Sequence, residues 1–287
     1  MKHEDGMLTL PPESKAAGAK LYWQKWLADD RPKALILLVH GYAEHTGRYQ
    51  YFAEHCVARG YAVYAVDHWG HGKSDGTPGF VPGFAVFRDG VDQLLVQAKQ
   101  DHSDLPIILV GHSMGGLISA TYLLTEQTSF AACVLSGPAI KAAEEPSAFL
   151  KAISGFLSRF FPRLGVLGLD PNGVSRDPKV VADYLADPLV YNGKIGARLA
   201  TEMLANMTIV QNNAGQISLP LLMLHGEDDS LAGVEGSRFL DAHVSSQDKM
   251  LKIYPGLFHE IFNEPEKDKV LTDMTDWLDE QLAVGKG

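Results

Sequence analysis

The pentapeptide GHSMG at 111–115 places one serine between two glycines, after an apolar run and before a helical pattern. It fits G-x-S-x-G, in which a strand turns sharply into a helix. Such a turn predicts a strained backbone at Ser113 and no space for side chains two positions either side, hence both glycines. The serine hydroxyl would then stand clear of the sheet as a nucleophile. An ordinary strand-to-helix turn without chemistry is the alternative.

A serine nucleophile needs a base to take its proton and an acid to orient that base. For this turn the chain order is serine, then an acid, then histidine, each just beyond a strand. The stretch LLMLHGEDD supplies the acid, and Asp229 on its loop fits best. Asp228 and, less well, Glu227 are its rivals.

His259, in LKIYPGLFHE after the last apolar run, is the predicted base. A surface loop histidine is the alternative. Two more histidines follow the serine, but His225 lies at a strand end and His243 within a helical pattern. Neither position suits a base that must reach Ser113.

Acyl transfer also needs donors for the oxyanion. His40 and Gly41 end an early apolar run, and Gly41 lets the backbone turn so that the Tyr42 N–H faces the serine. With the Met114 N–H, this predicts an oxyanion hole of two backbone donors.

The elements that must position these residues alternate along the chain. Continuous apolar runs indicate strands buried on both faces; they span 34–41, 61–67, 106–111, 131–137, 220–226 and 249–256. Helical patterns lie between them, at 48–59, 84–102, 115–127 and from Pro265 onward. The alternation predicts an α/β fold with a mostly parallel, doubly wound sheet. The start of the chain, without a helix between its strand-like pieces, predicts an antiparallel edge.

The alternation of strands and helices is interrupted at 141–218, where about 80 residues separate two neighbouring strands. We therefore expect a core of 1–140 and 219–287 and an inserted helical cap, or lid, at 141–218. Within it, the stretch 146–169 is rich in large apolar residues and holds three basic residues but no acid. It could pack on the core, line an acyl-chain tunnel or rest on a lipid surface.

The blocks HGYAEHTGRY, DHWGHGKSDG, GHSMGG, HGEDD and LKIYPGLFHE together resemble the monoacylglycerol lipase family of serine α/β-hydrolases. The resemblance runs from about residue 34 to 265 and includes DYLADPLVY in the insertion. It implies an α/β-hydrolase fold and the same triad and oxyanion residues as above. It also implies polar contacts to the glycerol end of a substrate from Glu44, Arg48 and Tyr184.

Two features qualify that resemblance. Animal-type members carry a second histidine three positions after the catalytic one, where this chain has Phe262, so head-group contacts and the preferred substrate are expected to differ. Without the resemblance, Glu44 and Arg48 at i, i+4 spacing would be interpreted as a surface ion pair.

Charge and composition exclude other classes. The formal net charge of −10 disfavours nucleic acid as a partner. The two cysteines, Cys56 and Cys133, are expected to be small buried hydrophobes rather than a disulfide. The start of the chain has no apolar leader and no run spans a membrane, so we expect a cytoplasmic protein, peripheral to membrane at most.

Two other motifs are set aside. HGKSDG ends like a phosphate-binding loop, but the leading glycine is missing and no helix follows. Asp67, His68 and His71 could suggest a metal, yet residues in a turn after a strand are more often structural, and a triad hydrolase needs no metal or cofactor.

The sequence therefore predicts a serine hydrolase that cleaves monoacylglycerols, or similar esters, to free fatty acid and glycerol through an acyl-enzyme. A broader carboxylesterase or lysophospholipase is the alternative within hydrolases. A binding protein on an inactive hydrolase scaffold is the alternative outside them.

Overall fold

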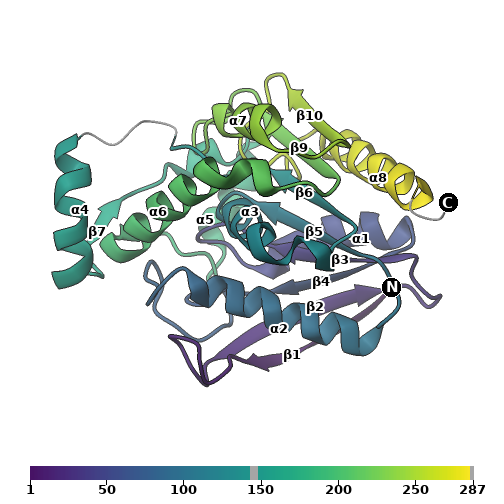
Figure 1. Cartoon of the computed structure of the whole chain (residues 1–287), viewed down its shortest axis with the longest axis horizontal. Helices are drawn as coiled ribbons and strands as arrows, with labels where there is room; N and C mark the ends of the chain where they lie inside the picture. Colours follow the sequence, from purple (N-terminus) through teal and green to yellow (C-terminus); the bar gives the residue numbers. More distant parts are fainter. Residues whose placement is uncertain (143–147, 285–287) are drawn as a thin grey trace.

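A computed structural model describes residues 1–142 and 148–284, with the backbone alone for 148–153 and 284. The described residues form a central sheet of eight strands in the order β1-β2-β4-β3-β5-β6-β9-β10 (Figure 1). These strands are β1 (Lys2–Thr9), β2 (Lys20–Leu27), β3 (Ala34–Val39), β4 (Tyr61–Val66), β5 (Ile107–His112), β6 (Ala132–Ser136), β9 (Leu221–Gly226) and β10 (Lys249–Tyr254). From β4 to β10 all neighbours are parallel, whereas β1 and β2 form an antiparallel edge. Both predictions about the sheet are confirmed.

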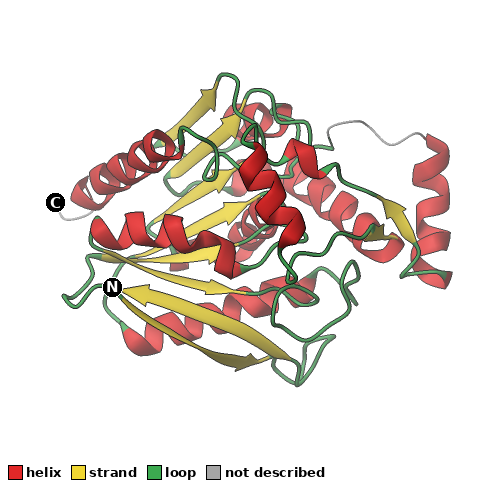
Figure 2. Ribbon diagram, turned by 180° about the vertical axis from the view of Figure 1, so that it is seen from behind, coloured by secondary structure: helices red, strands yellow, loops and turns green. Residues whose placement is uncertain are grey.

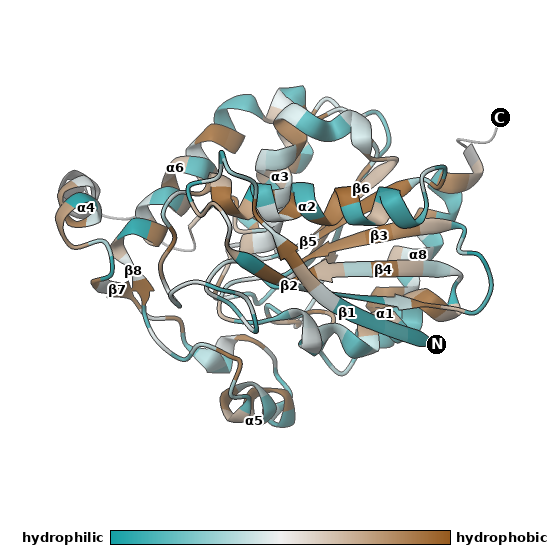
Figure 3. Ribbon diagram, turned by 90° about the horizontal axis from the view of Figure 1, so that it is seen from below, coloured by the Kyte–Doolittle hydropathy of each residue, from teal (hydrophilic) through white to brown (hydrophobic). Residues whose placement is uncertain are grey.

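Helices cover both faces of the sheet (Figure 2). One face carries α1 (Gln50–Ala58) and α8 (Lys267–Val284); the other carries α2 (Ala85–Asp101), α3 (Met114–Glu126) and α7 (Glu235–His243). Successive strand residues point to opposite faces: in β3, Ile36 packs with the α1 and α8 side and Leu37 with the other. Because both layers need apolar residues, the inner strands are largely apolar, as the brown of β3 and β6 in Figure 3 shows, whereas the edge strand β1 is polar and exposed. Cys56 and Cys133 are free and buried in these layers, as predicted.

The strand order places a crevice at one edge of the sheet. From β3 the chain passes to β4 on one side, whereas from β5, on the other side of β3, it passes to β6 in the opposite direction. Ligands of open α/β sheets bind at such a switch point. The register pairs Val39 with Gly111 and His112 with Ser136, which brings the loops after β3 and β5 together above that edge.

Apart from two short 3-10 turns, η1 (Thr46–Tyr49) and η2 (Gln127–Ser129), the remaining elements lie in the segment between β6 and β9. They are α4 (Ala148–Phe160), β7 (Gly165–Leu167), the 3-10 turn η3 (Pro171–Gly173), α5 (Pro178–Ala186), β8 (Ile195–Gly196), α6 (Ala197–Asn213) and a short turn, η4 (Ala214–Gln216). Figures 1 and 3 show α4 and β7 far from the central sheet. Helix α6, in contrast, packs on α3 and contributes Leu199 and Val210 to the core. The boundaries 141–218 for the cap therefore stay a prediction, and residues 146–147 of the apolar stretch lie outside the described residues.

Candidate active site

Ser113 lies at the turn between β5 and α3 in a conformation rare for a side chain-bearing residue, with φ 54° and ψ −118°. A Cβ on Gly115 would lie 2.0 Å from the Val39 carbonyl oxygen, and one on Gly111 would lie 2.4 Å from Ser119 Oγ. The predicted strain and the predicted need for both glycines are confirmed. The serine is thereby lifted off the sheet edge at the amino end of α3.

His259, in the loop after β10, contacts Asp229 in the loop after β9. Its Nδ1 lies 2.6 Å from Asp229 Oδ2. A carboxylate only accepts, so Nδ1 carries the hydrogen and the lone pair is left on Nε2, the form of a general base. Asp228 and Glu227, the rivals of Asp229, are exposed to solvent.

The two groups shift each other's ionisation. Burial lowers the pKa of His259, but the negative charge and the hydrogen bond of Asp229 outweigh it, and the net pKa is raised. Burial raises the pKa of Asp229, but the His259 charge and hydrogen bonds from His225, His259 and the Ala232 N–H bring that pKa well below its usual range. Asp229 is therefore ionised at neutral pH.

Asp229 is fixed by more than the histidine it orients. Its Oδ1 accepts the backbone N–H groups of Leu231 and Ala232 at 2.8 and 2.9 Å. His225 Nε2 lies 3.1 Å from Oδ2, and His225 Nδ1 lies 2.7 Å from Ser237 Oγ. Sequence reasoning weighed His225 only as a base and missed this contact. Its place at the end of β9, four residues before the acid, was the available signal.

The loop after β3 approaches the serine closely. Glu44 Oε1 accepts the Gly41 N–H at 2.6 Å, and a Cβ on Gly41 would lie 3.1 Å from Ser113 Cβ. Tyr42 follows, and Ala43 has φ 68°. On the other side, Met114 is the first residue of α3, where backbone N–H groups lack an acceptor within the helix. The oxyanion hole formed by the Tyr42 and Met114 N–H groups stays a prediction.

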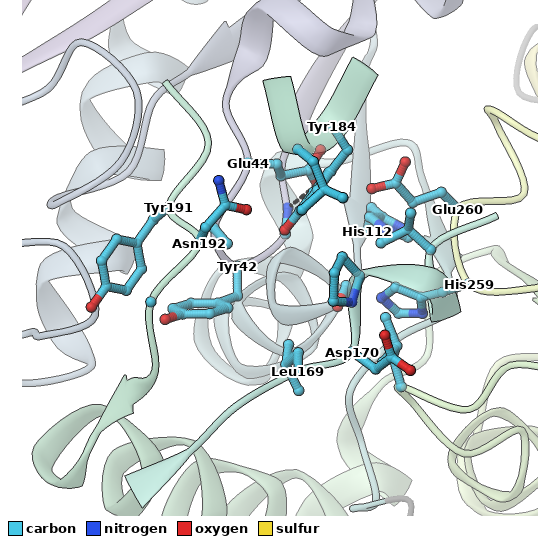
Figure 4. Close-up of a pocket in the computed structure, with 18 residues that line it drawn as sticks. Tyr42, Glu44, His112, Leu169, Asp170, Tyr184, Tyr191, Asn192, His259 and Glu260 are labelled. Atoms are coloured by element: carbon cyan, nitrogen blue, oxygen red, sulfur yellow. Dashed lines mark hydrogen bonds between the residues drawn. The ribbon is translucent and has the colours of Figure 1, made fainter. Parts of the chain in front are cut away.

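Ser113 and His259 line a single pocket (Figure 4). One side of it is polar and is formed by Glu44, His112, Tyr184 and Glu260. The lining also includes apolar and aromatic side chains, together with Asp170 and Asn192; the apolar and aromatic residues are Tyr42, Leu169, Pro171, Val174, Leu185, Tyr191 and Leu231. In the described part of the chain no hydrogen bond joins Ser113 Oγ to His259, which is common for catalytic pairs before substrate binds.

The residues implied as head-group contacts differ in their placement. Glu44 and Tyr184 line the pocket, whereas Arg48 is not one of its lining residues. Arg48 donates two hydrogen bonds to Glu260, at 2.7 and 2.8 Å, and one to Glu44 at 3.1 Å. The side chains of Arg48 and Glu44 are only 10% and 4% exposed, so the interpretation as a surface ion pair is wrong. Sequence reasoning did not single out Glu260.

Phe262 packs in the core and does not line the pocket. It is buried, and its ring centroid lies 5.2 Å from that of Phe52.

Asp67 is held by hydrogen bonds within the fold. It accepts the Thr46 N–H and hydroxyl at 2.8 and 2.7 Å and the Lys73 N–H at 2.8 Å. It therefore ties together the loops after β3 and β4.

Comparison with known proteins places this geometry among hydrolases. A family model described as "Serine aminopeptidase, S33" matches residues 30–266. A monoacylglycerol lipase from Mycolicibacterium smegmatis is 42% identical over 261 residues, which cover 91% of this chain and 93% of that protein.

Solved structures agree with this assignment. The crystal structure of a monoacylglycerol lipase from Paleococcus ferrophilus, 32% identical, superimposes with a TM-score of 0.82 over 91% of this chain and 99% of that one. A soluble variant of the monoglyceride lipase from Saccharomyces cerevisiae, in complex with a substrate analogue, is 26% identical and has a TM-score of 0.82 over 93% and 94% of the two chains. The α/β-hydrolase fold predicted from the sequence is confirmed.

Proposed function

Because the chain belongs to the monoacylglycerol lipase family of serine α/β-hydrolases, we propose that it hydrolyses monoacylglycerols to glycerol and free fatty acid. The observation that carries the proposal is the strained Ser113, which shares a pocket with His259 while His259 contacts Asp229 at 2.6 Å. These contacts support the roles of nucleophile for Ser113, base for His259 and orienting acid for Asp229.

The reaction has two halves. Ser113 Oγ attacks the ester carbonyl carbon while His259 Nε2 takes the hydroxyl proton, and the Tyr42 and Met114 N–H groups stabilise the oxyanion. The intermediate collapses, His259 returns the proton to the departing glycerol oxygen, and the acyl group stays on Ser113. Water then attacks the acyl-enzyme, with His259 again as base. Fatty acid leaves and the serine hydroxyl is regenerated.

The pocket lining holds both polar and apolar residues, which suit the two ends of the substrate. We assign the glycerol end to the polar side, where Glu44 and Tyr184 present oxygen atoms, with Arg48 acting through Glu44. The acyl chain would contact the apolar and aromatic residues of the lining. Among them, Leu169 and Leu185 belong to the predicted cap and are 41% and 47% exposed. A long chain would therefore leave the pocket between cap residues.

The outer surface of the predicted cap supports a lipid-surface role. Five large apolar side chains on α4 and in the segment that follows are at least half exposed; we call them the outer cap patch: Phe156, Phe160, Phe161, Leu164 and Leu167. The Arg159 guanidinium lies over the Phe160 ring at 5.8 Å. In the described part of the chain no helix is long and apolar enough to cross a membrane. We propose that this patch makes transient contact with a lipid surface and that the protein works in the cytoplasm.

Substrate comparison tests the proposal. The purified chain should hydrolyse monoacylglycerols faster than diacylglycerols, lysophospholipids or simple short-chain esters, and Ser113→Ala should remove turnover without unfolding the protein. Indifference to the glycerol group would favour a broader carboxylesterase, and preference for lysophospholipids a lysophospholipase. Absence of fluorophosphonate labelling at Ser113 would instead favour a binding protein and overturn the proposal.

A further inference from the structure

We propose that the ion pair between Arg48 and Glu260 is a positioning device for the reaction, which holds the oxyanion loop and the base loop in a fixed relation above Ser113. The oxyanion loop is the segment 40–45 and the base loop is the segment 257–262. This inference rests on the triad of the proposed function and not on the identity of its alcohol product.

The pair has the geometry of a rigid connection. Arg48 Nη1 and Nη2 donate to Glu260 Oε1 and Oε2 at 2.7 and 2.8 Å. Two parallel hydrogen bonds from a planar guanidinium fix orientation as well as distance. The side chains are 10% and 6% exposed, so solvent weakens the contact little.

The Arg48–Glu260 ion pair is linked at one end to the catalytic base and at the other to the oxyanion loop. Glu260 directly follows His259 in the chain. At the other end, Arg48 Nη1 donates to Glu44 Oε2 at 3.1 Å, and Glu44 Oε1 accepts the Gly41 N–H at 2.6 Å. Gly41 directly precedes Tyr42, the proposed oxyanion donor. Hydrogen bonds therefore run without a gap from the base loop to the oxyanion loop.

Charge makes Arg48 necessary to this arrangement. Glu44 and Glu260 are buried carboxylates that face the same guanidinium, and their other partners are neutral: the Tyr49 hydroxyl for Glu44 and the Asn263 amide for Glu260. Burial raises the pKa of Glu260, but the charge and hydrogen bonds of Arg48 outweigh it and lower the net pKa. Without Arg48, two buried carboxylates would repel each other and move apart.

The predicted cap closes over the same pair. The Tyr184 ring of α5 lies over the Arg48 guanidinium, 4.7 Å from ring centroid to Cζ. The Glu260 N–H donates to the Val174 carbonyl at 2.8 Å, which ties the base loop to the segment between η3 and α5. Arg48 itself does not line the pocket. Its contacts are those of a side chain that organises neighbours rather than one that touches substrate.

Kinetics of Glu260→Gln on two substrates separates positioning from head-group binding. Glutamine keeps the shape but loses the charge and one acceptor for Arg48. A displacement of ~1 Å of the base or the oxyanion donors lowers kcat about 10- to 100-fold. We expect that loss for a monoacylglycerol and equally for p-nitrophenyl butyrate, which has no glycerol. A raised KM for the monoacylglycerol alone, with kcat for p-nitrophenyl butyrate unchanged, would overturn the inference.

The pH dependence of kcat/KM gives a second test, because it would not change if Glu260 only stabilised the fold. Several charged and titratable groups lie around His259. Asp229 contacts its Nδ1, the carboxylates of Glu44 and Glu260 raise its pKa, and the centroid of the His112 ring lies 4.7 Å from that of His259. Arg48 is bound to Glu260, and Asp170 lines the same pocket. Catalysis needs neutral His259, so kcat/KM falls as pH falls through its pKa. The Glu260 charge raises that pKa. The acid limb should therefore shift to lower pH in Glu260→Gln, and an unmoved limb would contradict the assignment.

Two more variants complete the test. Arg48→Lys keeps the positive charge but loses the contact through two parallel hydrogen bonds. We therefore expect kcat to fall for both substrates while the acid limb of the pH profile stays in place, and an unchanged kcat would overturn the inference. This variant also tests the inference if Glu260→Gln does not fold. The control is Asp101→Asn, which removes the charge of Asp101 from its ion pair with the buried Lys25, at 2.7 Å between β2 and α2. It should lower the Tm and leave kcat and the profile unchanged. Wild-type turnover of p-nitrophenyl butyrate but not of monoacylglycerols would sink only the proposed function.

Discussion

Asp229 uses both carboxylate oxygens for orientation, one toward the loop backbone and one toward two histidines. Replacing it by asparagine would present an amide N–H to His259 Nδ1 and favour the wrong tautomer of the imidazole. From the loss seen when a triad aspartate becomes asparagine, we expect kcat of Asp229→Asn to fall about 10⁴-fold. The far-UV circular dichroism spectrum should be unchanged.

Asp228→Asn is the control for that variant, because the neighbouring carboxylate is exposed to solvent. It should keep wild-type kcat. If Asp229→Asn retained more than a tenth of kcat, or if both variants lost activity alike, the orienting acid would have to be sought elsewhere.

The turn from β5 to α3 depends on a missing side chain. A Cβ on Gly115 would lie 2.0 Å from the Val39 carbonyl oxygen and 2.4 Å from that of His40, both backbone atoms that cannot move aside cheaply. Gly115→Ala should therefore lower the free energy of unfolding by about 3 kcal/mol or more. Urea denaturation measures this change.

Gly155→Ala is the matched change in α4, where an added Cβ meets nothing within 4 Å. Alanine is the better helix former, so this variant should be more stable by roughly 0.5–1 kcal/mol. Equal stability of the two variants would mean that the crowding at the turn is relieved by a backbone shift.

The inner strands were predictable from sequence because helices cover both faces of the sheet, so β3, β4, β5, β6 and β9 are buried, largely apolar runs. Parallel strands end at the same edge, which is why Ser113, Asp229 and His259 could be named from their places after strands. The contact of Arg48 with Glu260 joins residues 212 positions apart, and no local pattern reports it. The packing of α6 on α3 is equally non-local, and it blurs the boundary of the cap.

Seen whole, the molecule combines a formal charge of −10 with an apolar, locally basic outer cap patch on one side. Such a distribution favours docking by the patch while the acidic body stays in water. The double variant Phe160→Ser, Phe161→Ser should reduce sedimentation with phosphatidylcholine vesicles that contain monoacylglycerol, and should slow turnover of that lipid. Its activity on soluble p-nitrophenyl butyrate should be unchanged.

Met250→Ser is the comparison for vesicle binding, because Met250 is 44% exposed on β10, outside the patch. It should sediment like the wild type. Equal loss of binding in both proteins, or none in the double variant, would show that the outer cap patch does not recognise lipid.

The burial of both thiols has a practical consequence. Cys56 and Cys133 are 0% exposed, and burial raises the pKa of each, so neither offers a thiolate to an alkylating reagent at neutral pH. One cysteine introduced at the surface, as in Leu167→Cys, would then be the single reactive position for a maleimide dye. Fluorescence from that position could follow the cap in real time as lipid arrives, without first removing the native cysteines.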